Sequence, residues 1–196
     1  MYCEDEIMIG LIGAVFLMGI VIGCSTLTRL GDVVGRKPIF LLGLVMHLGF
    51  MVGIIISTNK IISYVLLFTF GMSLTARYYV GYTYNLEMQP KSHYVLVSTT
   101  MFITESFVYI FICLFFMLIS DQWKLLQIPN FICSIAGIIF LLFMPESPRF
   151  LVAQRRFADA REVFKWIGIK NGLSLSEIEE KLDKIKFEGE APIPKD

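Results

Sequence analysis

Net charge, paired cysteines and a basic amino-terminal segment are all missing from this sequence. The 17 Lys and Arg balance the 17 Asp and Glu, so no global charge favours nucleic acid or an acidic partner. The four cysteines show no paired spacing, which predicts neither a disulfide framework nor a metal site. The first residues, MYCEDE, are acidic where a signal peptide would be basic.

Catalytic patterns are missing as well. The sequence contains no recognisable nucleophile–base pair, no His-x-x-x-His and no pair of aspartates within an apolar run. These patterns supply the nucleophile, the metal ligands or the acid–base pair of an intramembrane enzyme. We therefore expect no enzyme activity and no cofactor.

Charge is nearly absent from five long apolar runs, and the mean hydropathy of the chain is +0.68. A helix needs roughly 20 apolar residues to cross a bilayer core of ~30 Å, and only helices or closed barrels satisfy the backbone in lipid. The two-residue alternation of a barrel strand is absent. The sequence therefore predicts an all-α, polytopic membrane protein within residues 1–144, with spans at residues 7–28, 38–57, 62–86, 94–119 and 125–144.

The basic residues predict how these helices lie in the membrane. Short connections rich in Lys and Arg remain on the cytoplasmic side. Residues 29–37, 87–93 and everything after residue 144 hold nearly all of them, whereas the alternate connections hold only Lys60 and Lys124. We therefore expect an extracytoplasmic N-terminus and a cytoplasmic C-terminus.

Residues 145–196 have the composition of a soluble segment. Phe157, Ala160, Val163, Phe164 and Ile167 follow a helical period, and a second amphipathic pattern follows Ser174, which forms a capping-box pattern with Glu177. The sequence predicts a cytoplasmic linker with two amphipathic helices. They could cover the cytoplasmic face or recruit a partner.

Two motifs resemble a known family. Asp32-x-x-Gly35-Arg36-Lys37, with Gly19 and Gly23 upstream, resembles the signature loop between the second and third helices of the major facilitator superfamily. Residues 145–151, PESPRFL, resemble the segment after the sixth helix in its sugar porter and organic-cation transporter branches. Residues 3–6, CEDE, resemble the end of the first extracellular loop in the organic-cation branch.

The resemblance implies both the extent and the function of the chain. It places helices two to six and the central linker here, so a first helix and a complementary second half would lie outside this fragment. It implies a secondary-active, alternating-access transporter in the lipid bilayer, for a small organic solute such as a sugar or an organic cation, coupled to a proton or sodium. The alternative is a truncated, non-transporting membrane protein that acts as an assembly or regulatory subunit.

Two charged residues lie inside the predicted spans, Arg77 and Glu105. A charge at the bilayer centre costs at least ~2.5–3.5 kcal/mol on insertion scales. The two side chains could form a structural ion pair, or they could face the central cavity and bind a substrate or a proton. Tyr82 and Tyr84, close to Arg77, could line that cavity or pack between helices, and His47 is expected to be a helix-contact residue.

A second charged group is expected at the cytoplasmic ends of the helices. Its members are Asp32, Arg36, Lys37, Glu87, Glu146 and Arg149, with Gly35 in the signature loop. The resemblance implies a latch that closes this side while the transporter is open outward, and the alternative is that these charges only set the topology. Gly19 and Gly23, four residues apart, would let helices approach closely.

Overall fold

The computed structural model describes the backbone of residues 6–120 and 122–184, and every regular element in this part of the chain is helical. The chain divides into two compact units, residues 1–144 and residues 145–196. The CEDE pattern lies at residues 3–6, of which only Glu6 falls among the described backbone positions, and the last twelve residues are outside them.

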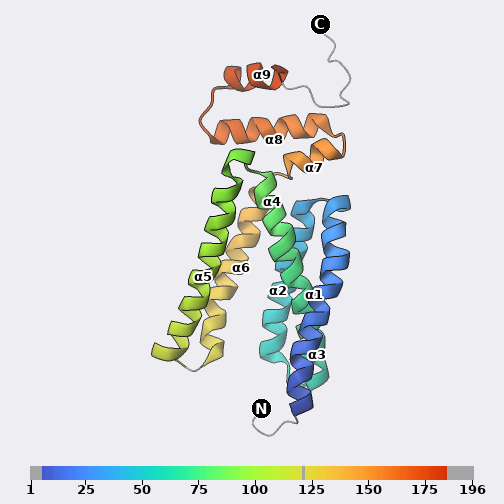
Figure 1. Ribbon diagram of the computed structural model, residues 1–196, viewed down its shortest axis with the longest axis vertical. Helices are drawn as coiled ribbons and strands as arrows, with labels where there is room; N and C mark the ends of the chain where they lie inside the picture. Colours follow the sequence, from blue (N-terminus) through green and yellow to red (C-terminus); the bar gives the residue numbers. More distant parts are fainter. Residues whose placement is uncertain (1–5, 121, 185–196) are drawn as a thin grey trace. The chain divides into compact units, whose positions relative to one another are not determined.

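The first unit is a bundle of long helices (Figure 1). Its elements are α1 (Glu6–Val34), α2 (Arg36–Ile56), α3 (Lys60–Thr75), a π-helical turn η1 (Ala76–Val80), α4 (Gly81–Glu87), a 3-10 turn η2 (Lys91–His93), α5 (Tyr94–Leu118) and α6 (Trp123–Phe143). Because α3, η1 and α4 run on without a break, the described part of the bundle has five helices that are long and apolar enough to cross a membrane. The all-α, five-span fold predicted from the sequence is confirmed.

The connection between α1 and α2 is much shorter than the connection over residues 29–37 that the sequence predicted. α1 continues through Arg29 and Asp32 to Val34, and only Gly35 interrupts the helix. Gly35 has φ 129° and ψ 158°, a conformation open to glycine because it lacks a Cβ atom. The turn therefore takes place at a single residue, which brings the charges of the signature loop onto two helix ends.

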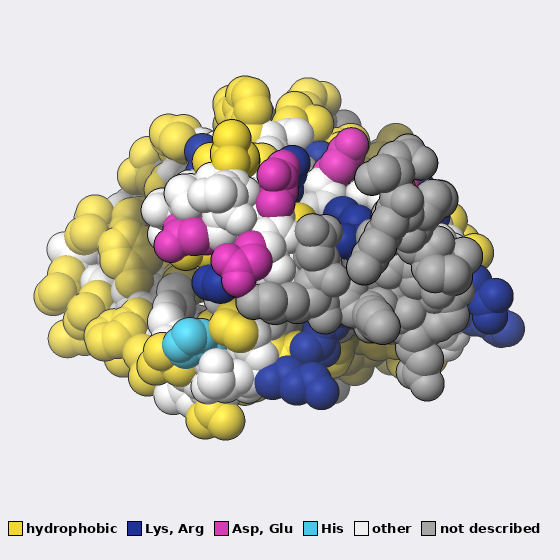
Figure 2. Space-filling model, turned by 90° about the horizontal axis from the view of Figure 1, so that it is seen from above, with side chains coloured by type: hydrophobic (Ala, Val, Ile, Leu, Met, Phe, Trp, Pro, Cys, Tyr) yellow, Lys and Arg dark blue, Asp and Glu magenta, His cyan; other side chains and the backbone are white. Residues whose placement is uncertain are grey.

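The bundle is held by small apolar clusters between its helices. Leu27, Ile39, Ala76 and Val80 join α1, α2 and η1, and Leu44, Tyr84 and Leu141 join α2, α4 and α6. Large hydrophobic side chains elsewhere stay exposed, such as Phe107, Ile132 and Phe143. In the space-filling view, hydrophobic side chains are abundant at the surface (Figure 2). Such an outer surface suits helices that are surrounded by lipid.

The second unit contains α7 (Pro148–Ala153), α8 (Phe157–Lys170) and α9 (Leu175–Lys184). Ser147 caps α7, its Oγ accepting the N–H of Phe150 at 3.2 Å, and Gly172 with φ 79° follows the end of α8. The predicted capping box forms: the Ser174 N–H donates to Glu177 Oε2 at 3.0 Å, and the Glu177 N–H donates to Ser174 Oγ at 3.4 Å.

Buried side chains tie the three helices of this unit together. Phe150 and Leu151 of α7 pack with Ala160 and Val163 of α8, and Ile178 of α9 is buried. A Cβ atom on Gly168 would lie 2.8 Å from Ile178 Cδ1, so α8 and α9 approach closely at that point. The amphipathic patterns of the sequence therefore fold into a small core of their own.

Candidate functional site

Arg36 lies at the centre of the charged residues at one end of the bundle. Its Nη1 lies 2.7 Å from Asp32 Oδ1, one turn back across Gly35, and its Nη2 lies 3.2 Å from Glu87 Oε1 at the end of α4. Nη1 also donates to the Gly31 carbonyl at 2.6 Å. The side chains of Arg36 and Glu87 are each only 14% exposed, so this pair is less screened by water than an ordinary surface salt bridge.

Lys37 extends the same group of contacts to the end of α6. Its Nζ donates to the Met144 carbonyl at 2.5 Å and to the Leu142 carbonyl at 3.2 Å. Carbonyl groups at a helix C-terminus lack intrahelical partners, and a cation is favourable there. Asp32, Arg36, Lys37 and Glu87 therefore connect the ends of four helices: α1, α2, α4 and α6.

The remaining two members of the predicted latch, Glu146 and Arg149, belong to the second unit. Glu146 Oε1 accepts the N–H of Ser147 at 3.0 Å, next to the cap of α7. The structure thus brings Asp32, Arg36, Lys37 and Glu87 together within the bundle, and the part of Glu146 and Arg149 in a latch stays a prediction.

Arg77 lies in the π-helical turn and points toward α2. Its Nε donates to Ser73 Oγ at 3.3 Å, and the Ser73 hydroxyl donates to the Gly43 carbonyl at 2.9 Å. A Cβ atom on Gly43 would lie 3.1 Å from Arg77 Cγ, so glycine leaves space for the arginine stem. Within the described residues no carboxylate lies within 4.0 Å of Arg77, and the ion pair with Glu105 does not form.

Glu105 is held by tyrosine hydroxyls instead. Tyr78, the residue after Arg77, donates to Glu105 Oε2 at 2.8 Å, and Tyr109, one turn further along α5, donates to Glu105 Oε1 at 3.3 Å. The ring of Tyr79 stands edge-on to that of Tyr78, with 5.5 Å between the centroids. Each carboxylate oxygen of Glu105 therefore accepts a hydrogen bond from a phenol hydroxyl, and the rings of Tyr78, Tyr79 and Tyr109 lie nearby.

The other two tyrosines of the predicted site differ from each other. Tyr82 pairs with Ser98 of α5 through hydroxyls 2.8 Å apart. Tyr84 is only 5% exposed and packs between α2 and α6, a placement that fits the packing alternative. Tyr82 therefore lies on the same side of the α3–α4 helix as Tyr78, whereas Tyr84 lies in the apolar interior.

His47, which the sequence suggested only as a helix contact, occupies a more unusual position. It is 3% exposed, and its ring stacks on Phe70 at 5.7 Å between centroids. Neither ring nitrogen makes a hydrogen bond of regular geometry within the described part of the chain, but the Asn130 side chain lies close enough to the imidazole to interact with it, and the Arg77 guanidinium is the nearby charge. Asn130 was missed because a single amide in an apolar run carries no sequence signal.

Gly19 and Gly23 lie where α1 crosses α3. A Cβ atom on Gly19 would lie 2.2 Å from the Phe68 carbonyl oxygen, and one on Gly23 would lie 2.9 Å from Thr75 Oγ1. Gly71 is the partner that the sequence did not indicate, because a Cβ atom there would lie 2.3 Å from the Phe16 carbonyl oxygen. The two backbones therefore meet directly through opposed glycines.

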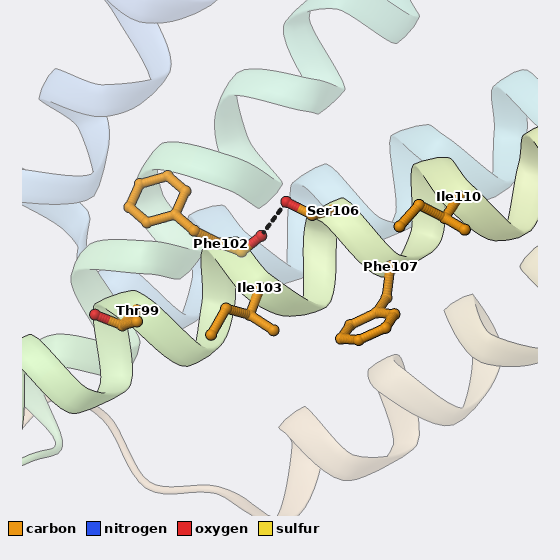
Figure 3. A pocket seen from close by; sticks show the side chains of 6 residues that line it. All are labelled: Thr99, Phe102, Ile103, Ser106, Phe107 and Ile110. Carbon is orange, nitrogen blue, oxygen red and sulfur yellow. Dashed lines mark hydrogen bonds between the residues drawn. The ribbon is translucent and has the colours of Figure 1, made fainter.

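A shallow apolar groove runs along one face of α5. Thr99, Phe102, Ile103, Ser106, Phe107 and Ile110 line it (Figure 3). The Ser106 hydroxyl donates to the Phe102 carbonyl of its own helix at 2.9 Å (Figure 3). The groove therefore offers mainly apolar contact area and little polar recognition.

Comparison with known proteins agrees with this architecture. The family model "Sugar (and other) transporter" matches residues 2–193. "Solute carrier family 22 member 4" of Mus musculus is 30% identical over 164 residues, which are 83% of this chain and 30% of that protein. "Organic cation/carnitine transporter 2" of Homo sapiens is 29% identical over 172 residues, 87% of this chain and 31% of that protein.

A less similar relative matches a comparable share of this chain and of its own length. "Organic cation transporter protein" of Drosophila melanogaster is 25% identical over 184 residues, 92% of this chain and 33% of that protein. The chain thus spans about a third of the length of the relatives that it matches. The family match over almost the whole chain, together with five membrane-spanning helices, shows that this protein belongs to the sugar (and other) transporter family of the major facilitator superfamily.

Proposed function

We propose that this chain forms part of a secondary-active transporter that carries small organic cations by alternating access. Membership of the family supports transport of a small organic solute. The observation that carries the finer proposal is Glu105, a carboxylate inside a membrane-spanning helix with two phenols on its oxygens. Two of the three relatives named above have "organic cation" in their names.

The surroundings of Glu105 favour a cation over a sugar. A charge within the membrane is costly and calls for a counter-charge, yet no basic side chain of the described residues lies within 4.0 Å of this carboxylate. A bound ammonium group would supply the missing charge. The rings of Tyr78, Tyr79 and Tyr109 could stabilise it through their π faces.

The ends of the helices would supply the gate. The Arg36 contacts join α1 and α2 to α4, and rocking of one half of a transporter against the other changes such contacts at the membrane surface. We place this end on the cytoplasmic side because its connections carry most of the Lys and Arg. A coupling proton or sodium ion would compete for the same Glu105 carboxylate.

Binding of choline to the full chain in lipid nanodiscs tests the cation site. Replacing Glu105 by Gln removes the charge and keeps the shape. We expect choline affinity to fall at least about tenfold, because hydrogen bonds and contacts to a charged group contribute about 1.5–3 kcal/mol. Glu162→Gln, the same change on the exposed face of α8, should leave the affinity unchanged.

Two results would contradict the proposal. One is unaltered choline affinity in Glu105→Gln. The other is displacement of choline by glucose at concentrations at which glucose itself binds, since that would place a sugar in the same site.

A further inference from the structure

A partly enclosed pocket lies at the end of the bundle opposite to the α1–α2 connection. The first turns of α1, the last turn of α2 and the first turns of α3 meet there (Figure 1). The pocket has a volume of about 400 Å³. Pockets that bind small organic molecules have this size, and they are mainly apolar with a few polar groups. Neither the proposed cation site nor the charged contacts of Arg36 involve this pocket.

Aliphatic side chains from all three helices form the apolar wall of the pocket. Ile9 and Ile12 come from α1, Ile54 from α2 and Leu67 from α3. An isoleucine in a helix has one strongly preferred χ1 rotamer, so this wall keeps its shape without a ligand. Such a wall suits a rigid apolar body better than a flexible chain, because a rigid body loses little conformational entropy on binding.

Tyr64 closes one side of the pocket. Its hydroxyl donates to the Met8 carbonyl at 3.3 Å, which connects α3 to α1, and both residues line the pocket. This hydrogen bond occupies the tyrosine hydroxyl within the protein. The phenol ring is therefore fixed in position and offers a flat apolar contact surface.

The polar side of the pocket lies at the α2–α3 connection. The Ser57 and Ser63 hydroxyls are 3.2 Å apart, and they lie 3.2 and 3.1 Å from the Asn59 carbonyl oxygen. Each hydroxyl has one hydrogen and two lone pairs, so these contacts use the hydrogens and leave lone pairs that can accept. The ammonium group of Lys60, also at the pocket, is a donor. A ligand hydroxyl, which both donates and accepts, matches this set, whereas a carboxylate only accepts.

The sequence has a matching pattern at the same place. Lys60, Tyr64 and Leu67 are a basic, an aromatic and an aliphatic residue within two turns of α3. Short motifs proposed for cholesterol contact combine these three residue types with a few residues between them. Such a motif is weak evidence when it is read from sequence alone, but here all three residues line one pocket.

We propose that this pocket binds a sterol, with the sterol hydroxyl at Ser57, Ser63 and Lys60 and the fused rings against the aliphatic wall and Tyr64. The membrane spans of α1 and α3 begin at this end and that of α2 ends there, at the boundary between the hydrocarbon core and the head groups. A sterol in the bilayer therefore reaches the pocket with its hydroxyl at the membrane surface. The inference does not depend on the cation site at Glu105.

Photolabelling of the full chain in lipid nanodiscs tests the pocket, and the probe is a cholesterol analogue with a diazirine on its ring system. We expect labelled peptides from the start of α1 and from residues 54–67, and excess cholesterol should prevent this labelling. Leu67→Trp fills the pocket and should remove most of the labelling. Val65→Trp, at a position of α3 that is 60% exposed and outside the pocket, should preserve it.

Competition in the unmodified protein decides the case in which Leu67→Trp does not fold. Epicholesterol differs from cholesterol only in the orientation of its hydroxyl, so it should compete about three- to tenfold less well, the effect of roughly one hydrogen bond. Oleate, an anionic amphiphile with a flexible chain, should compete more weakly than cholesterol.

Three results would overturn the sterol pocket. They are unlabelled peptides at these segments in the unmodified protein, equal competition by the two sterol epimers, and stronger competition by oleate than by cholesterol. Labelling that persists in a folded Leu67→Trp variant would also contradict it.

Discussion

Glu105 and Arg77 carry opposite charges on neighbouring helices, yet hydroxyl groups hold each of them apart from the other. Two phenols occupy the oxygens of Glu105, and Ser73 accepts the Nε donor of Arg77. A direct ion pair would neutralise both charges and leave no differential affinity for a solute. Keeping the charges separate inside the membrane is costly, and the cation proposed to bind at Glu105 would offset part of that cost.

The sequence identified both charges but could not say which neighbours they have. Helical depth placed Arg77 and Glu105 within reach of one another, but the direction of each side chain depends on the local helix. Arg77 stands in a π-helical turn, which changes the angular spacing of residues and is often found at functional sites. No sequence pattern predicts such a turn, nor that the side chain of Asn130 would lie beside the buried imidazole of His47.

Gly71 tests the close crossing of α1 and α3 at the residue scale. Replacing it by Val places new atoms against the Phe16 carbonyl oxygen, which would be 2.3 Å from Cβ. The obstacle is backbone and cannot rotate away, so we expect a loss of about 3 kcal/mol in the free energy of unfolding, the upper end of the usual range for overpacking. Gly10→Val on α1, the other helix of the crossing, is the control, because nothing lies within 4 Å of its Cβ position.

Thermal unfolding of both variants in detergent measures the difference. The melting temperature of Gly71→Val should fall well below that of Gly10→Val. Equal melting temperatures would mean that α1 and α3 do not meet through this glycine.

At the scale of elements, the sequence predicted the helices better than their connections. Long apolar runs identified all five spans, since their length alone excludes most alternatives. The α1–α2 connection was predicted over residues 29–37, because its charged residues separate the apolar spans at residues 7–28 and 38–57. In the structure α1 continues to Val34 and α2 begins at Arg36, and the Arg36–Asp32 pair across Gly35 stabilises the two helix ends.

The α8–α9 pair has a pH dependence that follows from two carboxylates. The hydrogen bond from Lys165 and its charge hold the pKa of Glu179 below its ordinary value of 4.5. Hydrogen bonds from the Ser174 hydroxyl and backbone likewise lower the pKa of Glu177. Because both groups bind protons more weakly in the folded state, their stabilisation is present above the ordinary pKa and is lost as the pH falls through the folded values.

Trp166 on α8 reports on this unit once Trp123 is replaced by Phe. We expect the urea midpoint of its fluorescence to fall as the pH drops below about 4.5. The double variant Glu177→Gln, Glu179→Gln should show a smaller fall. An equal fall in both proteins would assign the pH dependence to other groups.

At the scale of the whole molecule, the bundle concentrates its ionic contacts at one end and its glycine contacts along a helix crossing. The ends of α1, α2, α4 and α6 meet through Asp32, Arg36, Lys37 and Glu87. The charged contacts at this end are predicted either to act as a gate or only to set the topology, and the two roles predict different results when the contacts are removed. A gate stabilises the conformation in which this end is closed, so removing its contacts lowers the population of that conformation.

Arg36→Ala distinguishes these alternatives. It removes both carboxylate contacts, so a gate would lose stability in the state that closes this end. Cysteines placed near Tyr64, toward the opposite end of the bundle, should then react more slowly with a membrane-impermeant thiol reagent, because the outward-open state is less populated. Arg29→Ala is the control, and equal labelling rates in the two variants would leave topology as the role of Arg36.

The central claim is that membrane-spanning helices bring the Asp32 segment and the Arg149 segment to the same side of a bilayer. The most direct test places single cysteines at Val33 and at Gln154 in a protein from which the native cysteines have been removed. These variants are labelled with an impermeant thiol reagent in sealed, oriented vesicles. The account predicts that both are labelled only from the cytoplasmic face. Labelling of the two positions from opposite faces would contradict it.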